Sequence, residues 1–193
     1  MQNKQTKQLN EIAEIILGYT FRNSLVPQTS GNTFVIQARN ISENLVIKNN
    51  DLLKINLENN RSKSSVKNND IVLSSRGIFK SSVVKSDSDN LIASASVYLL
   101  RLKTAEVIPE YLSIYLNSDF VQKKINEKIT GAVIKTLLKK DVSEIEIIIP
   151  DLIDQKKIVD IYFNNLEQKR LLNKKIELIN QINKGAINKI INF

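Results

Sequence analysis

The chain has 193 residues, of which 42% are hydrophobic and 25% are charged, and this composition is typical of one globular domain or of a domain with an appendage. It contains no cysteine and no histidine, which excludes disulfides, cysteine or histidine metal sites, thiolate nucleophiles and Ser-His-Asp triads. The formal net charge of +8 favours a polyanionic partner, because lysine and arginine that neutralise phosphates release counterions.

The sequence shows no targeting or membrane segment. The first ten residues are polar, and the longest apolar runs are only a few residues long. We therefore predict no signal peptide and no membrane span, and we expect a cytoplasmic protein.

Residues 1–150 have the pattern of a mixed α/β domain. Short runs rich in β-branched and aromatic residues alternate with clusters of Asn, Ser, Asp and Gly, which is typical of strands joined by turns. The runs predicted to be strands are 34–37, 52–57, 70–74, 97–102 and 143–149. The segment 56–69 is predicted to be an exposed loop, and Pro109 begins a helix predicted over 110–128.

Two strand ends in this domain carry side chains suited to reading bases. Gln37, Arg39 and Asn40 follow the first predicted strand, and glutamine and asparagine match the edge of adenine. Arg76 and Gly77 follow a later strand, where glycine permits a close backbone approach and arginine can pair bidentately with guanine. Surface turns without a binding role explain these residues as well, so they are candidates for DNA contact.

Basic charge is concentrated in one segment. Residues 121–140 hold six lysines and one glutamate, a net charge of +5 that equals the surplus of 1–150 as a whole. Looser candidates for phosphate contact, with a solvated surface as the alternative, are Lys80, Lys123, Lys124 and Lys128. Tyr111 and Tyr115 have helical spacing, and we predict that they belong to the core rather than stack on bases.

The last part of the chain, 151–193, has no proline and a single glycine, and its apolar residues recur at helical spacing. We predict one amphipathic helix about 58 Å long, at roughly 1.5 Å per residue. Pro150 ends the preceding strand, and Asp151 or Asp154 is the predicted N-cap. The predicted domains are therefore 1–150 and 151–193.

The predicted helix has an apolar face that one copy of the chain cannot bury. The heptad positions are Leu172, Ile176, Ile179, Asn183, Ala186, Ile190 and Phe193. The apolar residues that flank this stripe are Leu171, Leu178, Ile182, Ile187 and Ile191. The fold class predicted is therefore α+β, a mixed α/β domain followed by one long helix that forms an intermolecular antiparallel coiled coil or bundle.

The sequence carries no pattern typical of catalysis. It has no Gly-x-Gly, no P-loop and no Asn/Asp-Pro-Pro-Tyr/Phe tetrapeptide. Pro150-Asp151 and Glu167-x-Lys169 match the spacing of a nuclease motif. However, carboxylates sixteen residues apart on one helix are separated by roughly 24 Å, too far to share a metal ion. We predict no catalytic residue, no metal and no cofactor.

The segment 115–162 carries an ordered set of motifs. A predicted helix leads into Gly131, Ile134, Lys135 and Leu137, a strand-like run at 147–150 then ends at proline, and Gln155, Lys156 and Ile158 begin the long helix. This order resembles the specificity subunit of type I restriction–modification systems, in which a helix leads into a Gly-x-x-Ile-Lys-x-Leu segment, then a strand that ends at proline, then a Gln-Lys/Arg-x-Ile start to a long helix. The segments 11–22, 67–84 and 183–193 resemble the start of the domain, a strand-to-glycine segment and the C-terminus of the same family.

The resemblance implies that 1–150 is a target recognition domain for a short half-site in double-stranded DNA. It further implies that the long helix is a spacer that docks modification (methyltransferase) subunits, and it leaves open whether a restriction or motor subunit joins. The usual subunit has two recognition domains and two helices, and this chain has one of each. We therefore expect a half-length form, a homodimer that reads an interrupted palindrome, with Gly131 and Lys135 at the DNA and Lys135 on a phosphate.

Two other functions fit parts of the sequence. A stand-alone dimeric DNA-binding protein, such as a transcriptional repressor, would use the same basic domain and dimer helix, although no helix-turn-helix pattern is evident. A structural coiled-coil adaptor would use the helix alone, and the local basic charge argues against it. Association with a methyltransferase subunit distinguishes the first reading from both alternatives.

Overall fold

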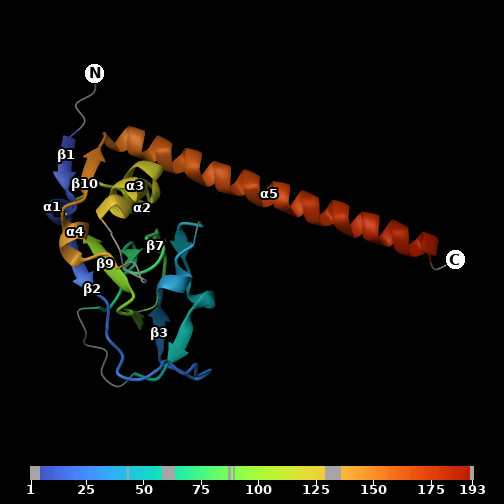
Figure 1. Ribbon diagram of the computed structural model, residues 1–193, viewed down its shortest axis with the longest axis horizontal. Coiled ribbons are helices and arrows are strands. Elements are labelled where there is room, and N and C mark those ends of the chain that lie inside the picture. The colour runs from blue at the N-terminus through green and yellow to red at the C-terminus, as the bar shows by residue number, and fades with distance from the viewer. Residues whose placement is uncertain are drawn as a thin grey trace. The chain divides into compact units, whose positions relative to one another are not determined.

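The computed structural model describes residues 5–42, 44–57, 64–86, 88, 90–128 and 136–191. The chain divides into two units, Met1–Lys156 and Lys157–Phe193, and each is described by itself. Figure 1 shows the strands and the shorter helices in the first unit, while most of the long helix α5 (Leu152–Ile191) forms the second.

The strands described in the first unit form three sheets. The five-stranded sheet has the order β2 (Ala13–Leu17), β9 (Val97–Leu102), β6 (Ile71–Ser74), β7 (Ser81–Val84) and β4 (Val46–Ile47). The three-stranded sheet has the order β5 (Leu53–Ile55), β3 (Thr33–Ile36) and β8 (Leu91–Ala93). Neighbouring strands are antiparallel except in the pairs β4–β7 and β3–β8. The third sheet pairs β1 (Gln5–Gln8) with β10 (Glu146–Ile149).

The five-stranded and three-stranded sheets share one hydrophobic core. Ile36 from β3 and Leu91 from β8 pack in the same cluster as Val72 from β6 and Leu99 from β9. The alternate residues of β3 and β8 point to the other face, where they form a second cluster with Tyr19, Phe21 and Leu25. The three-stranded sheet is thus covered on both faces, which explains why its short strands are almost entirely apolar.

Short helices connect and cover the sheets. They are α1 (Leu9–Ile12), η1 (Ala38–Asn40), η2 (Asn49–Asp51), α2 (Pro109–Asn117), α3 (Asp119–Lys128) and α4 (Lys139–Ser143). Helix α2 lies against β7, where the Ser81 and Ser113 hydroxyls are 2.9 Å apart and the Asn117 side-chain amide donates to the Ser81 carbonyl oxygen. Figure 1 shows α2 and α3 beside β1 and β10, and the Tyr115 hydroxyl accordingly donates to the Glu146 carbonyl oxygen.

The helix predicted over 110–128 is in fact two helices. Ser118 has an extended backbone, with φ −64° and ψ 147°, and it separates α2 from α3. Its hydroxyl donates to the Tyr115 carbonyl oxygen (2.7 Å) and accepts from the Val121 N–H (3.4 Å). A serine side chain that bonds backbone groups on both sides in this way competes with a continuous helix.

An ion pair between half-buried Arg101 and buried Asp70 ties two distant segments of the first unit together. The Arg101 guanidinium donates to both carboxylate oxygens of Asp70, at 3.0 and 2.7 Å, and to the Ser65 carbonyl oxygen. Asp70 is buried and also accepts the Lys67 N–H, so its charge is fully bonded. The pKa of Arg101 is raised, mainly by the hydrogen bond to Asp70.

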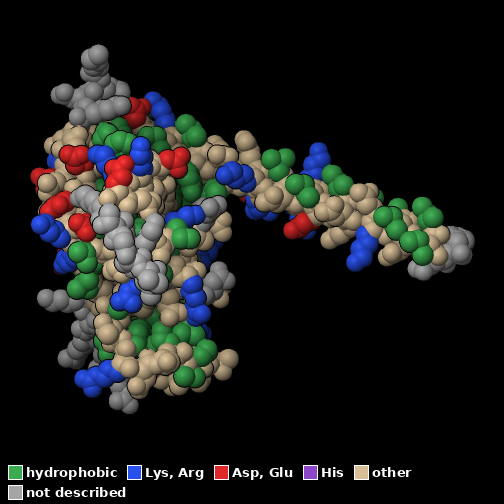
Figure 2. All heavy atoms as spheres, viewed as in Figure 1, with side chains coloured by type: hydrophobic (Ala, Val, Ile, Leu, Met, Phe, Trp, Pro, Cys, Tyr) green, Lys and Arg blue, Asp and Glu red, His purple; other side chains and the backbone are tan. Residues whose placement is uncertain are grey.

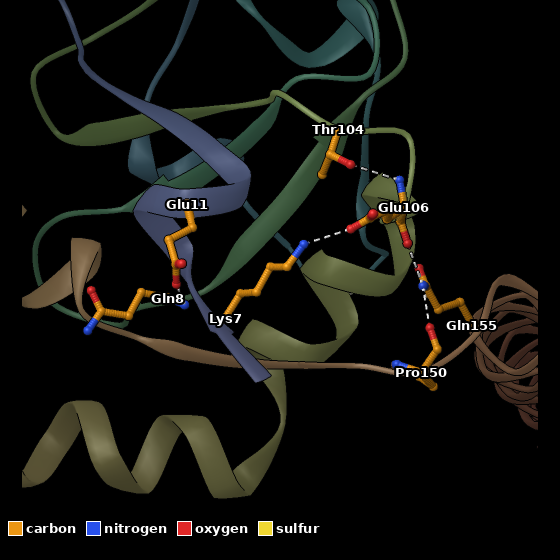
Figure 3. Close-up of polar contacts among 7 residues, drawn as sticks. All are labelled: Lys7, Gln8, Glu11, Thr104, Glu106, Pro150 and Gln155. Atoms are coloured by element: carbon orange, nitrogen blue, oxygen red, sulfur yellow. Dashed lines mark hydrogen bonds and ion pairs between the residues drawn. The ribbon is translucent and has the colours of Figure 1, made fainter. Parts of the chain in front are cut away.

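The start of α5 is bonded into the first unit through Gln155, which is completely buried. Its side-chain nitrogen donates to the carbonyl oxygens of Glu106 and Pro150, both at 2.8 Å (Figure 3). Its side-chain oxygen accepts the Ile108 N–H, also at 2.8 Å. One glutamine thereby satisfies three backbone groups at the junction of α2, β10 and α5.

Neighbouring contacts in Figure 3 complete this junction. Lys7 of β1 forms an ion pair with Glu106 (2.8 Å), and Thr104 accepts the Glu106 N–H. The predicted cap of the long helix is confirmed at Asp151, whose carboxylate accepts the Asp154 N–H at 2.8 Å.

Candidate nucleic-acid interface

The loop between β6 and β7, residues 75–80, has an exposed tip. Gly77 has a φ of +75°, a left-handed conformation that glycine adopts readily and other residues rarely. Arg76 and Ile78 on either side of it are exposed, and Phe79 then returns to the core, where it is 2% exposed. The glycine therefore supplies the turn that presents Arg76 and Ile78 to solvent.

Hydrogen bonds hold this loop at its base. The Ser74 N–H donates to the Lys80 carbonyl oxygen (2.9 Å), and the Ser74 hydroxyl donates to the Arg76 carbonyl oxygen (2.8 Å). From α3, the Gln122 amide donates to the Phe79 carbonyl oxygen at 2.6 Å. The loop tip is thus mounted on a fixed frame, as a binding loop requires.

The other predicted contact segment lies in and around η1, directly after β3. The Asn40 side-chain oxygen accepts the Gln37 N–H (2.8 Å), and the Ala38 N–H donates to the Ser96 hydroxyl (3.1 Å). Arg39 is exposed, whereas Gln37 and Asn40 are half-buried. The amide oxygen of Asn40 therefore closes the turn, and Arg39 is the member of this group that the turn presents to solvent.

The two segments meet in one open hollow of about 480 Å³. Its lining residues come from η1 and the residues after it, and from the β6–β7 loop: Ala38, Arg39, Ile41, Ser42, Ser74, Arg76, Ile78 and Lys80. Three predicted contact residues, Arg39, Arg76 and Lys80, are thereby brought together, and Gly77 lies between two of the lining residues. Gln37 and Asn40 are not among the lining residues.

Sheet pairing brings these segments together. Strand β4 follows η1 and pairs in parallel with β7, with Val46 opposite Val83. The Val83 N–H donates to the Leu45 carbonyl oxygen (2.7 Å), and the Ser82 hydroxyl donates to the Ser42 carbonyl oxygen. This parallel pairing over a long sequence separation has no local signature, and sequence reasoning accordingly missed Ile41, Ser42 and Ile78.

The charged side chains that line the hollow, Arg39, Arg76 and Lys80, are all cationic. None of the described residues that line it is acidic. Within the described ranges, neither Arg39 nor Arg76 forms an ion pair. On the face drawn in Figure 2, Asp and Glu side chains gather at the end of the first unit that holds β1 and β10. At the end that holds β3, the charged side chains visible in this view are Lys and Arg, drawn in blue. Such a surface is suited to phosphate groups.

Two further predicted contacts, Gly131 and Lys135, lie outside the described residues. The described chain resumes at Thr136, which forms a β-bridge with Arg76. The Leu137 N–H then donates to the Ser75 carbonyl oxygen at 2.9 Å. Lys135 as a phosphate contact therefore stays a prediction.

Helix α3 and the tyrosines before it serve mainly in packing. Lys124 forms an ion pair with Glu146 (3.1 Å) and lies over the Phe120 ring, while Lys123 is exposed and Lys128 ends the helix. Tyr111 is buried, and its hydroxyl donates to the Ile148 carbonyl oxygen. Burial, with a smaller contribution from Tyr115, raises the pKa of Tyr111 to about 12. The prediction that Tyr111 belongs to the core is confirmed.

The described residues contain no group of three acidic side chains that could hold a metal ion. The carboxylates of the nuclease-like spacing have other partners, since Asp151 caps α5 and Glu167 forms an ion pair with Arg170 at 2.7 Å. The hydrogen bond from Arg170 lowers the pKa of Glu167. No described helix has both the length and the apolar character that crossing a bilayer requires.

The predicted partner-facing residues of α5 are all exposed. They are Leu172, Ile176, Ile179, Asn183, Ala186 and Ile190. The flanking apolar residues Leu171, Leu178, Ile182, Ile187 and Ile191 are exposed too. Figure 2 shows apolar side chains distributed along this helix. The hydrophobic effect therefore favours the burial of this helix against another apolar surface.

Comparison with solved structures identifies the same architecture in three proteins. The HsdS subunit from Thermoanaerobacter tengcongensis is 19% identical, with a TM-score of 0.59 over 89% of this chain and 39% of that chain. The S subunit of the type I restriction–modification system from M. genitalium is 17% identical, with a TM-score of 0.59 over 89% of this chain and 41% of that chain.

A chain from a structural study of complex assembly and conformational transition in the type I R-M system is also similar. It is 17% identical, with a TM-score of 0.65 over 88% of this chain and 40% of that chain. The present chain thus spans about two fifths of the length of these structures. The sequence matched none of the curated proteins with which it was compared.

The sequence itself matches a family model. The model of the type I restriction modification DNA specificity domain matches residues 1–184, which is nearly the whole chain. The α+β architecture with a long helix after a sheet-rich domain agrees with this match, and the predicted fold class is confirmed in that respect. The chain therefore belongs to the family of type I restriction modification DNA specificity domains.

Proposed function

We propose that the first unit binds a DNA half-site and that the hollow between η1 and the β6–β7 loop contacts it. The observation that carries this proposal is the convergence of Arg39, Arg76 and Lys80 on one hollow whose described lining has no carboxylate. Arginine pairs bidentately with guanine and lysine neutralises phosphate, so both base contacts and phosphate contacts are available there.

Arginine variants with a matched control test this interface. Arg39→Ala and Arg76→Ala should each weaken binding to the preferred duplex by about 1–3 kcal/mol and relax the preference at one position of each half-site. Arg22→Ala removes the same charge from an exposed arginine that does not line the hollow, so it should leave the preference unchanged. Equal effects of all three variants, measured by fluorescence anisotropy, would contradict the proposed interface.

Lys135→Ala tests the predicted contact between Lys135, which lies outside the described residues, and a DNA phosphate. A phosphate contact positions the protein without reading sequence, so affinity should fall equally for preferred and random duplexes. The slope of binding against salt concentration should also become shallower. A changed sequence preference would instead assign Lys135 to a base.

We further propose that two copies of the chain assemble through α5 into an antiparallel dimer. The apolar residues of this helix from Leu171 to Ile191 are exposed, and a partner helix covers such a face in coiled coils and bundles. A two-fold axis presents two identical recognition units in opposite orientations. The target is accordingly an interrupted palindrome with two inverted half-sites.

The gap between the half-sites offers a separate test. The helices act as the spacer, so the half-site centres are proposed to lie about one helical turn of DNA apart or somewhat more, at roughly 34 Å per turn. Deleting one heptad from α5 should shorten the gap and leave the half-sites readable. Mapping methylated sites in cells that carry the full-length or shortened gene measures this. An asymmetric or uninterrupted site would refute the homodimer.

The chain is proposed to act without catalysis of its own, as the specificity component of a methyltransferase complex. The sequence lacks methyltransferase motifs, which supports this proposal. Co-purification with a methyltransferase subunit is the expected result. A dimer that binds DNA and recruits no such subunit would indicate a stand-alone DNA-binding protein, such as a repressor.

A further inference from the structure

Ile78 is an apolar side chain held in solvent on a loop between Arg76 and Lys80. It is 73% exposed, although the next residue, Phe79, is buried. The loop is held at its base by the bond between the Ser74 N–H and the Lys80 carbonyl oxygen, and Lys80 N–H donates to the Ile78 carbonyl oxygen at 3.0 Å. The exposure of Ile78 is therefore imposed by a bonded loop.

The surroundings of Ile78 indicate the chemistry of its partner. Arg76 and Lys80 flank it on the same loop, and Ala38 and Ile41 line the same hollow from the opposite segment. The hollow is thus lined by both apolar and cationic side chains. A polyanion that also presents a small apolar group would complement both features.

Duplex DNA has one such group in its major groove, the C5-methyl group of thymine. An apolar side chain can neither neutralise a phosphate nor hydrogen-bond to it, so it can read sequence only through contact with a base. Ile78 lines an open hollow together with Arg76 and Lys80, so a duplex whose phosphates meet these cations can bring the edge of a base to it. The geometry favours contact with the edge of a base.

We propose that Ile78 is a specificity-determining residue that packs against the methyl group of a thymine in each half-site. The inference rests on the proposed DNA-binding function and specifies one position of the site. Isoleucine is stiff about its first side-chain torsion, so the contact depends on where the loop holds the backbone. A·T is accordingly preferred at the base pair that Ile78 meets.

The test uses the full chain and a duplex enriched by it from a random-sequence pool. Each thymine of that duplex is replaced in turn by deoxyuridine, which removes the methyl group and leaves base pairing intact. One symmetry-related pair of thymines should respond, with binding about fourfold weaker per replaced thymine, as expected for one buried methyl group. Binding is measured by anisotropy at one salt concentration.

Protein variants complete the cycle. Ile78→Ala should bind the enriched duplex about tenfold more weakly per half-site and should lose the response to deoxyuridine. Val26→Ala is the matched control, because Val26 is 66% exposed and does not line this hollow, and it should behave as the unmodified protein. Because the Ile78 side chain is exposed, the Ile78→Ala variant should unfold at the same temperature as the unmodified protein.

Several results would overturn the proposal. They are an enriched site without thymine, no response to deoxyuridine at any position, or a response that persists in Ile78→Ala. A loss of affinity in Ile78→Ala that is equal for methylated and methyl-free duplexes would assign Ile78 to a wedge between stacked base pairs. If no duplex is enriched, or if Arg76→Ala does not weaken binding, the proposed DNA interface fails as well, and that outcome is distinct from a failure of Ile78 alone.

Discussion

The two units of the chain treat apolar side chains in opposite ways. In the first unit, Leu99 and Leu91 are completely buried between two sheets. The second cluster, which includes Phe21, covers the other face of the three-stranded sheet. In the second unit, Leu172 and Ile176 are exposed along with every other described apolar residue from Leu171 to Ile191. The first unit is stabilised by its own core, whereas the exposed apolar residues of the second unit would gain hydrophobic stabilisation from the proposed partner helix.

The largest expected effect is on the second unit. Ile176→Asp places a carboxylate from each copy in the proposed seam, and each unpaired buried charge costs several kcal/mol. We expect the dimer to dissociate into monomers at micromolar concentration, as measured by light scattering. Gln181→Asp introduces the same charge at an outward heptad position and should leave the dimer intact. A dimer that survives Ile176→Asp would place the interface elsewhere.

A pair of leucine variants tests the comparison directly. Leu99→Ala should lower the free energy of unfolding by about 2–5 kcal/mol, because it leaves a cavity between the sheets. Leu172→Ala should lower the stability of the monomer by less than about 0.5 kcal/mol, because its side chain is already in water. Urea unfolding of a monomeric background, such as Ile176→Asp, gives both values. Similar losses for the two variants would mean that α5 is buried by its own chain.

Alkaline pH should weaken the first unit selectively. The pKa of Tyr111 is raised by burial to about 12 from an ordinary value of 10, so the folded state disfavours the phenolate. Its contribution to stability is complete below pH 10 and is lost as the pH rises from 10 to 12, by roughly 2–3 kcal/mol. Tyr111→Phe should make this pH-dependent decline in the free energy of unfolding smaller. A part of the decline should remain, because the pKa of Tyr98 is also raised. If the decline is the same in Tyr111→Phe, ionisable groups other than Tyr111 cause it.

The smallest effect concerns the residue that bonds the start of α5 into the first unit. Gln155→Ala leaves the Ile108 N–H and two carbonyl oxygens without their partner, which should lower stability by about 1–3 kcal/mol. Lys156→Ala, at the adjacent exposed position, should change it by less than about 0.5 kcal/mol. Thermal unfolding of both variants measures the difference. Equal stability of the two would mean that water replaces the glutamine.

Local sequence signals predicted a definite part of the fold. β3, β5, β6, β9 and β10 lie within or overlap the predicted strands, because each combines β-branched residues with flanking turn residues. The long helix was predicted with its cap, since the absence of proline, the helical spacing and Asp151 are all local features. In contrast, β7 has two serines in four residues and was missed, because its place in the sheet depends on α2 and on β4.

For the candidate interface, the sequence by itself determined residue types and tertiary structure determined their arrangement. Arginine, lysine and glycine at strand ends identified Arg39, Arg76, Gly77 and Lys80 as candidates, because these residue types and turn positions are visible locally. Their meeting in one hollow depends on the parallel pairing of β4 with β7, which joins segments more than thirty residues apart. Ile78 lines the same hollow, and it is exposed although an isoleucine is usually buried. An apolar residue that the fold holds in water has no local signal, because burial is a property of the assembled chain.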